Sequence, residues 1–155
     1  MTARVSVREI GDGKAAICRT ILDDLPEWFG IPASKDMYVA EAAHLPMLAC
    51  HDGEAPVGFV SIKAHTPSAA ELFVLGVRRR YHRQGIGRAL IDAAVVYGEN
   101  EGLRVLTVKT LASTDPDPHY AATRRFYEAM GFLPIEIFPL LWGPENPCLM
   151  MMRVI

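Results

Sequence analysis

The chain contains 155 residues, of which 50% are hydrophobic and 22% are charged, and its formal net charge is −2. A chain of this length buries one core, so we expect a single domain over residues 1–155. No apolar run approaches the roughly 18 to 20 residues that span a bilayer, which argues against a membrane partner. The acidic balance argues against nucleic-acid binding, which needs a broadly basic surface.

The N-terminal segment and the cysteines indicate a cytoplasmic protein. Arg4 and Arg8 lie among alternating apolar residues, without the continuous apolar block of a secretory signal. Cys18, Cys50 and Cys148 are far apart, a spacing that fits neither a zinc site nor a small disulfide scaffold. We therefore expect buried, reduced thiols and no metal ion.

Apolar patterning predicts a mixture of strands and helices along the chain. Strands are expected where short apolar runs are bounded by turn residues, at about 5–10, 47–50, 57–63, 70–77, 105–110, 135–138 and 149–154. Helices are expected where apolar residues recur every three or four positions, at about 14–22, from 86 to a stop at Gly102, and at 120–130 before Gly131. This order favours a mixed α/β fold with one sheet between helices.

Two connections carry further signals. The segment 23–32 holds two prolines and the adjacent aromatics Trp28 and Phe29, which predicts a loop or a short helical turn. These aromatics line an acceptor pocket or anchor the core, and the sequence leaves both alternatives open. The pair Asp52-Gly53 predicts the turn of an antiparallel hairpin.

The strongest chemical signal is a glycine turn between the apolar strand at 70–77 and the next helix. A helix N-terminus offers unpaired N–H donors and a partial positive charge, which suits a phosphate group. Gly85 and Gly87 let the backbone approach phosphate and adopt dihedrals closed to other residues. Arg83 and Arg88 would add charge-assisted contacts.

Other phosphate-binding loops fit this segment poorly. A dinucleotide fingerprint requires a third glycine, which is missing after Gly87, and a nucleoside triphosphate loop requires Gly-Lys-Ser or Gly-Lys-Thr. A pyrophosphate bound without a metal remains, and coenzyme A carries one. A plain tight turn is the alternative, and the flanking strand, helix and arginines argue against it.

The turn resembles the central motif of the GNAT acetyltransferases, an Arg or Gln, two variable residues, Gly, any residue, then Gly or Ala. His82, Gly85 and Gly87 carry the match, with His82 replacing the usual Arg or Gln. The run at 123–132, TRRFYEAMGF, resembles the second signature of the family. The resemblance covers about residues 55–135, and the two signatures occur in the right order.

The resemblance implies a GNAT-like α/β (α+β) fold, with a mixed, mainly antiparallel central sheet flanked by helices on both faces and with splayed fourth and fifth strands. It implies acetyl-CoA as co-substrate, the pantetheine arm pairing with the end of the fourth strand and the pyrophosphate lying at the glycine turn. The implied cofactor-binding residues are Leu75, Gly76, Val77, Arg83, Gln84, Gly85, Ile86, Gly87, Arg88 and Phe126.

Two catalytic residues follow from the resemblance. Tyr127 matches the tyrosine that protonates the coenzyme A sulfur in many members of the family, although a packing role is the alternative. If Ala122, Phe126 and Ala129 form the apolar face of the helix, Tyr127 is rotated toward a cleft.

Glu71 matches the glutamate that some members use as general base, often through a water. A Glu71 that faces the surface without a role is the alternative. Rival bases or substrate contacts stand in the loop before the last helix, at Asp115, Asp117 and His119.

The sequence thus predicts an N-acetyltransferase that moves the acetyl group of acetyl-CoA to a primary amine, by direct attack in a ternary complex. No Ser or Cys stands in a nucleophile elbow that would suggest an acyl-enzyme. Trp28, Phe29 and His119 are candidate contacts to a small-molecule or peptide acceptor. The alternative is a non-catalytic acyl-CoA-binding or regulatory domain, which would not need Tyr127. A homodimer is compatible with the sequence.

Overall fold

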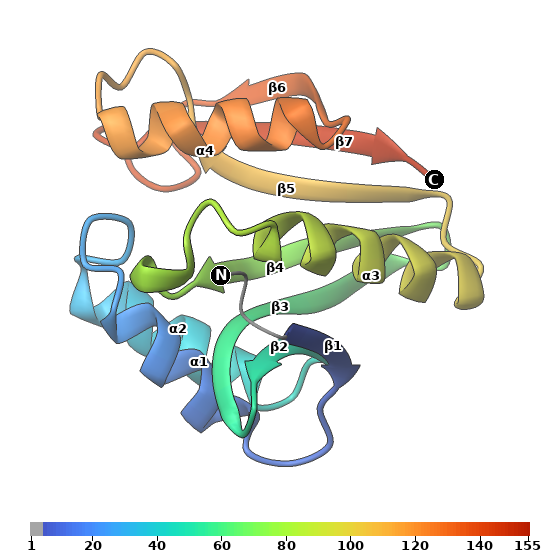
Figure 1. The fold of residues 1–155 in the computed structure, drawn as a ribbon. Coiled ribbons are helices and arrows are strands. Elements are labelled where there is room, and N and C mark those ends of the chain that lie inside the picture. Colours follow the sequence, from blue (N-terminus) through green and yellow to red (C-terminus); the bar gives the residue numbers. More distant parts are fainter. Residues whose placement is uncertain (1–4) are drawn as a thin grey trace. The chain divides into compact units, whose positions relative to one another are not determined.

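The structure is a computed structural model that describes residues 5–155, so Arg4 lies outside the described residues (Figure 1). Its elements in chain order are β1 Val5–Glu9, α1 Lys14–Asp23, α2 Pro32–Ala42, β2 Met47–Asp52, β3 Ala55–Thr66, β4 Ala69–Val77, the 3-10 turn η1 Arg79–Tyr81, α3 Ile86–Asn100, β5 Val105–Leu111, α4 Pro118–Ala129, β6 Leu133–Phe138 and β7 Cys148–Val154. All the predicted strands and helices are present, and α2 was not anticipated. No helix among the described residues is long and apolar enough to cross a membrane.

The strands form one mixed sheet. Hydrogen bonds join them in the order β1-β2-β3-β4-β5-β7-β6. The pair β4–β5 is parallel, through Ala69–Glu71 and Val105–Thr107, while β1–β2, β2–β3, β5–β7 and β6–β7 are antiparallel. The predicted mixed, mainly antiparallel sheet is therefore confirmed, as is the hairpin that turns at Gly53 with φ +62°.

Residue contacts group the chain into two compact units. Unit 1 contains the residues up to Lys63 together with Leu72–Tyr97, and unit 2 contains Ala64–Glu71 together with Gly98–Ile155. The predicted splay of the fourth and fifth strands concerns the placement of these units, so it stays a prediction. The single domain over residues 1–155 also stays a prediction.

Unit 1 has helices on both faces of its strands. An added Cβ at Gly58 of β3 would meet Ile86 and Leu90 of α3, whereas one at Gly76 of β4 would meet Ile21 and Leu25, in and just beyond α1. Opposite faces of the strands are thus covered by α3 and α1.

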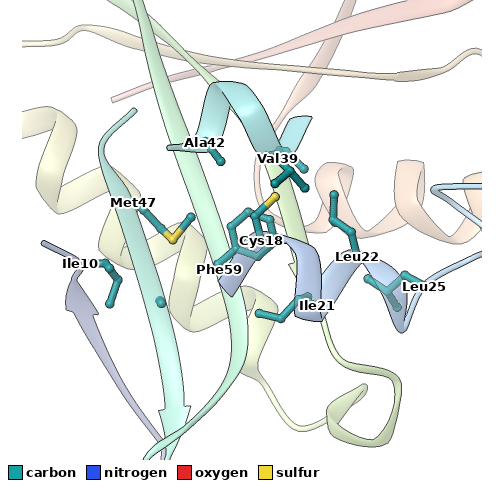
Figure 2. Packing of buried hydrophobic residues seen from close by; sticks show 11 residues of the cluster. Ile10, Cys18, Ile21, Leu22, Leu25, Val39, Ala42, Met47 and Phe59 are labelled. Atoms are coloured by element: carbon teal, nitrogen blue, oxygen red, sulfur yellow. The ribbon is translucent and has the colours of Figure 1, made fainter. Parts of the chain in front are cut away.

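A cluster of apolar side chains fills the space beneath α1 and α2 (Figure 2). Cys18, Ile21, Leu22 and Leu25 recur at helical spacing and are buried against Phe59 of β3. Full burial of a side chain such as Phe59 stabilises the fold by about 1.5 to 3 kcal/mol. This apolar stripe is why residues 14–23 form the helix that the sequence predicts.

In unit 2, α4 packs against β5, and its buried face differs from the predicted one (Figure 1). Tyr127 and Met130 are buried, whereas Ala122 and Ala129 are exposed and Phe126 is half-buried. The expectation that Ala122, Phe126 and Ala129 face the core was therefore wrong. Tyrosine and methionine bury more apolar area than two alanines, so the packing selects their face of the helix.

Glycine caps end α3 and α4 as predicted. Gly102 and Gly131 have φ values of +77° and +88°. The residue after each glycine donates its N–H to a carbonyl oxygen five residues earlier. Leu103 donates to the Gly98 oxygen at 2.8 Å, and Phe132 donates to the Tyr127 oxygen at 3.0 Å. The second bond brings Phe132 under Tyr127.

Candidate active site

The turn between β4 and α3 has a backbone shaped by two positive φ angles. Arg83 has φ +62° and Gly85 has φ +79°. The Gly85 carbonyl accepts the Ala89 N–H at 3.0 Å, which makes Gly85 the residue that caps α3. The N–H groups of Ile86, Gly87 and Arg88 therefore have no partner within the helix and point out of its N-terminus.

The two glycines of the turn have different roles. Gly87 is the second residue of α3, and its φ is not among the positive values, so the predicted left-handed conformation is correct only at Gly85. An added Cβ at Gly85 would meet no atom within 4 Å, so the space beside the turn is open.

Packing in unit 1 holds the N-terminus of α3 in place. Ile86 is only 1% exposed, and an added Cβ on Gly58 would lie 3.0 Å from its Cγ2 atom. The glycine in β3 thus allows the helix to lie close to the strand. Tyr81, in the turn before α3, donates its hydroxyl to Asp52 at 2.8 Å, and that bond raises its pKa.

The arginines around the turn divide into engaged and available groups. The Arg79 guanidinium pairs with Glu27, its backbone N–H donates to Asp24 at 2.7 Å, and Arg80 lies over the Tyr81 ring at 5.5 Å. Arg83 and Arg88 are exposed, and no ion pair among residues 5–155 engages them. These two side chains can contribute charge to a phosphate.

Side-chain packing within unit 1 determines which residues stand at the end of β4. Gly76 is a glycine because an added Cβ would lie 3.1 Å from Ile21 and 3.3 Å from Leu25. Leu75 and Val77 are half-buried, and the Val77 oxygen accepts a hydrogen bond from the His82 ring at 2.6 Å. His82 thus ties the turn back onto the strand.

The aromatic residues of the loop after α1 pack on unit 1. The centroids of the Trp28 and His82 rings are 5.9 Å apart. The Phe29 ring packs edge-on against Tyr38, and the Tyr38 ring packs in the same way against Phe73. Both loop aromatics are half-buried against the core cluster. Core anchoring accounts for them, although each keeps an accessible part.

In unit 2, Tyr127 is 7% exposed and lies between two phenylalanine rings. The ring centroids are 5.4 Å from Phe126 and 5.6 Å from Phe132. Packing and catalysis are compatible here, because a buried phenol still has a polar hydroxyl group that can act on a neighbour.

Glu71 is not a surface residue, because its side chain is only 5% exposed. Its Oε1 atom accepts a hydrogen bond from the His65 Nε2 atom at 2.7 Å and another from the Lys109 Nζ atom at 3.0 Å. Neither His65 nor Lys109 was predicted as a site residue. Strand pairing brings Lys109 to a carboxylate 38 positions away, and nothing in the local sequence marks that contact.

The rival bases before α4 have structural roles. Asp117 caps α4 by accepting the His119 N–H at 2.8 Å, and Asp115 accepts the Asp117 N–H at 2.9 Å. Both carboxylates therefore stabilise the start of the helix. The His119 side chain is half-buried.

The three cysteines are buried and free of disulfides. Burial raises the pKa of Cys18 to about 12 and that of Cys148 to about 11, and it also raises the pKa of Cys50. A neutral, buried thiol is a poor nucleophile. Among the described residues, no group of three His, Cys, Asp or Glu side chains is placed to hold a metal.

The chain matches the model of a known protein family. Residues 15–132 match the model of the acetyltransferase (GNAT) family. The chain is also 33% identical over 85 residues to a mycothiol acetyltransferase of Corynebacterium glutamicum, a match that covers 55% of this chain and 27% of the relative. The matched segment thus spans about a quarter of that longer protein.

Solved structures share the fold at low sequence identity. The ribosomal-protein-S18-alanine N-acetyltransferase from Escherichia coli has a TM-score of 0.76 and 20% identity, over 98% of this chain and 94% of its own. A GNAT family acetyltransferase from Elizabethkingia anophelis with acetyl-CoA bound has a TM-score of 0.73 and 14% identity, over 97% of this chain and 98% of its own.

Proposed function

The chain belongs to the GNAT acetyltransferase family, and we propose that it is an N-acetyltransferase that moves the acetyl group of acetyl-CoA to a primary amine. The observation that carries this proposal is the capped helix start of α3. There the Ile86, Gly87 and Arg88 amides have no acceptor within the helix, and an added Cβ at Gly85 would meet no atom within 4 Å. Three convergent N–H donors with a helix dipole suit a pyrophosphate.

Each part of the turn has a role in binding acetyl-CoA under this proposal. Gln84, Gly85, Ile86, Gly87 and Arg88 hold the pyrophosphate through backbone groups, and Arg83 and Arg88 supply charge. Leu75, Gly76 and Val77 offer strand backbone to the pantetheine arm, and Phe126 offers an apolar contact. Because Arg79 is committed to Glu27 and Asp24, it is left out of the phosphate-binding set.

The reaction needs an acid and a base. An amine near neutral pH is mostly protonated, so its nitrogen must lose a proton before it attacks the acetyl carbon, and the departing sulfur must gain one. We assign the role of general acid to Tyr127. The general base belongs to the cluster formed by the buried Glu71 with His65 and Lys109. Direct attack in a ternary complex is favoured because the cysteine thiols are buried and neutral.

The acceptor is a small-molecule or peptide amine. An N-acetyltransferase that acts on a ribosomal-protein alanine shares this fold, and so does a GNAT enzyme with acetyl-CoA bound. The accessible parts of Trp28, Phe29 and His119 are candidate acceptor contacts. A cytoplasmic location completes the proposal, and a homodimer is compatible with it.

Two measurements test the function. Calorimetric titration with coenzyme A should give saturable binding, and thiol release should appear when acetyl-CoA is supplied with a panel of primary amines. The buried cysteines give little background in such a thiol assay. Absence of coenzyme A binding would reject the proposal. Tight binding without turnover of any amine would favour the non-catalytic acyl-CoA-binding alternative.

A further inference from the structure

Three charged or titratable side chains of unit 2 meet at one carboxylate oxygen. His65 comes from the end of β3, Glu71 from the start of β4 and Lys109 from β5. The Glu71 Oε1 atom lies 2.7 Å from the His65 Nε2 atom and 3.0 Å from the Lys109 Nζ atom. The carboxylate is buried, whereas the His65 side chain is 44% exposed.

Glu71 is poorly suited to take a proton from an amine directly. Its charge is compensated by the Lys109 ammonium group, and one of its oxygens already accepts two hydrogen bonds. Protonating it would leave Lys109 beside a neutral acid, which removes the attraction of a buried ion pair. A base must also reach the substrate, and a side chain with 5% exposure does so less readily than its half-exposed neighbour.

The contact with Glu71 determines which nitrogen of His65 is basic. An ionised carboxylate only accepts hydrogen bonds, so the Nε2 atom of His65 must carry the proton in this bond. In a neutral imidazole the other nitrogen, Nδ1, then holds a free lone pair. An imidazole oriented in this way by a carboxylate is ready to accept a proton.

Strand register places this cluster on one face of unit 2. Glu71 pairs with Thr107, and Lys109 lies two residues further along β5, on the same side. The other side of β5 carries the buried Leu106, Val108 and Thr110. Glu71 and Lys109 therefore lie on the opposite face of the sheet from Leu106, Val108 and Thr110.

We propose that His65 is the general base of the reaction, that Glu71 is a positioning residue which orients its ring, and that Lys109 forms an ion pair with Glu71. This inference rests on the proposed acetyl transfer. The His65 Nδ1 atom takes one proton from the substrate ammonium group. The freed nitrogen lone pair bonds to the acetyl carbon, while the carbon–sulfur bond breaks and its electron pair leaves on sulfur.

The protons balance in this scheme. Sulfur gains a proton from Tyr127, and the second proton of the nitrogen, lost as the amide forms, restores that tyrosine. His65 returns the first proton to water. The Glu71 carboxylate stabilises the imidazolium while it lasts, whereas the nearby Lys109 cation opposes it. Cys148 of β7 also lies near this pair, but its raised pKa keeps it neutral.

His65→Gln separates the base from the structural contact. Glutamine places an amide nitrogen that can still donate to Glu71, but it has no basic nitrogen. The substrate is the primary amine that the wild-type enzyme acetylates fastest. We expect kcat for this amine to fall on the order of 100-fold. The Kd for acetyl-CoA and the urea concentration at the unfolding midpoint should be unchanged. The matched control is His44→Gln, at an exposed histidine of unit 1, which should behave as wild type. Wild-type turnover in His65→Gln would overturn the proposal.

Opposite charge changes test the arrangement further. Since only a neutral His65 can accept a proton, kcat/KM should rise with pH. Glu71→Gln removes the anion that stabilises the imidazolium and should move the acidic limb of the profile to lower pH. Lys109→Met removes the opposing cation and should move that limb to higher pH. Disappearance of the limb in Glu71→Gln alone would instead make Glu71 the base.

Nitrogen NMR of the histidine rings tests the geometry without any acceptor. Wild-type protein should show neutral His65 as the Nε2–H tautomer. An Nδ1–H tautomer would overturn the arrangement. If coenzyme A binds but no amine is acetylated, the proposed function fails and the base role falls with it, whatever the tautomer.

Discussion

Arg83 and Gly85 adopt similar positive φ angles two positions apart, and only one of them lacks a side chain. The left-handed conformation costs an L-residue with a side chain about 1 to 2 kcal/mol. Arg83 therefore carries a backbone strain that Gly85 avoids.

Gly85→Ala tests the backbone of the turn. Because an added Cβ would meet nothing within 4 Å, the penalty should come from the backbone alone. We expect the free energy of unfolding to fall by about 1 to 2 kcal/mol, and coenzyme A to bind more weakly. Urea unfolding and calorimetry measure the two effects. Gly11→Ala is the control, because it also has open space but no positive φ, and equal losses in both variants would contradict this account.

Tyr127→Phe tests the acid. The phenyl ring keeps its contacts with Phe126 and Phe132, so the fold should persist. Thiol release should slow on the order of 100-fold, with the acetyl-CoA Kd nearly unchanged. A thiol-release assay measures the rate, and calorimetric titration measures the acetyl-CoA Kd. An unaltered rate would remove Tyr127 from the mechanism and leave it as a packing residue.

At the scale of elements, α3 depends on a glycine in a strand. Gly58→Ala would place a Cβ 3.0 Å from Ile86 and 3.2 Å from Leu90, so α3 or the strand must shift. We expect a destabilisation of about 1 to 3 kcal/mol, as for other overpacked cores. A displaced helix start should also weaken coenzyme A binding. A variant that is destabilised but binds coenzyme A as wild type would show that the turn does not depend on this packing.

Strong apolar periodicity made most elements predictable. The helix α1 carries Cys18, Ile21 and Leu22 on its buried face, and the existence of this helix was predicted. By contrast, α2 buries only Val39 and Ala42, so its sequence shows little pattern, and its first residue is Pro32. The face of α4 was misjudged because the larger Tyr127 and Met130 side chains, rather than Ala122 and Ala129, are the ones that the packing buries.

The candidate site was predictable where a local motif encodes it. The glycine turn is read from consecutive residues, and the structure places it at a helix start, as expected. The contacts of Glu71 depend on which strands are neighbours, because His65 and Lys109 come from two other strands. Only the three-dimensional pairing reveals them.

For the whole molecule, buried thiols link stability to pH. Cys18 and Cys148 are fully buried, and burial raises their pKa values to about 12 and about 11. In the unfolded chain a thiol ionises near pH 8.5, roughly. Above that pH the unfolded state binds fewer protons than the folded state, so stability must fall as pH rises. Below it, the contribution of these thiols is fully present.

We therefore expect the free energy of unfolding to decline between about pH 9 and the folded pKa values, with each buried thiol adding up to about 1.4 kcal/mol per pH unit to the slope. Urea unfolding at several pH values measures this slope. Cys18→Ala lowers stability at every pH because it leaves a cavity, but it should remove one thiol's share of the slope. If the slope is the same in this variant as in wild type, Cys18 ionises as easily in the folded protein as in the unfolded chain, and its burial is not maintained in solution.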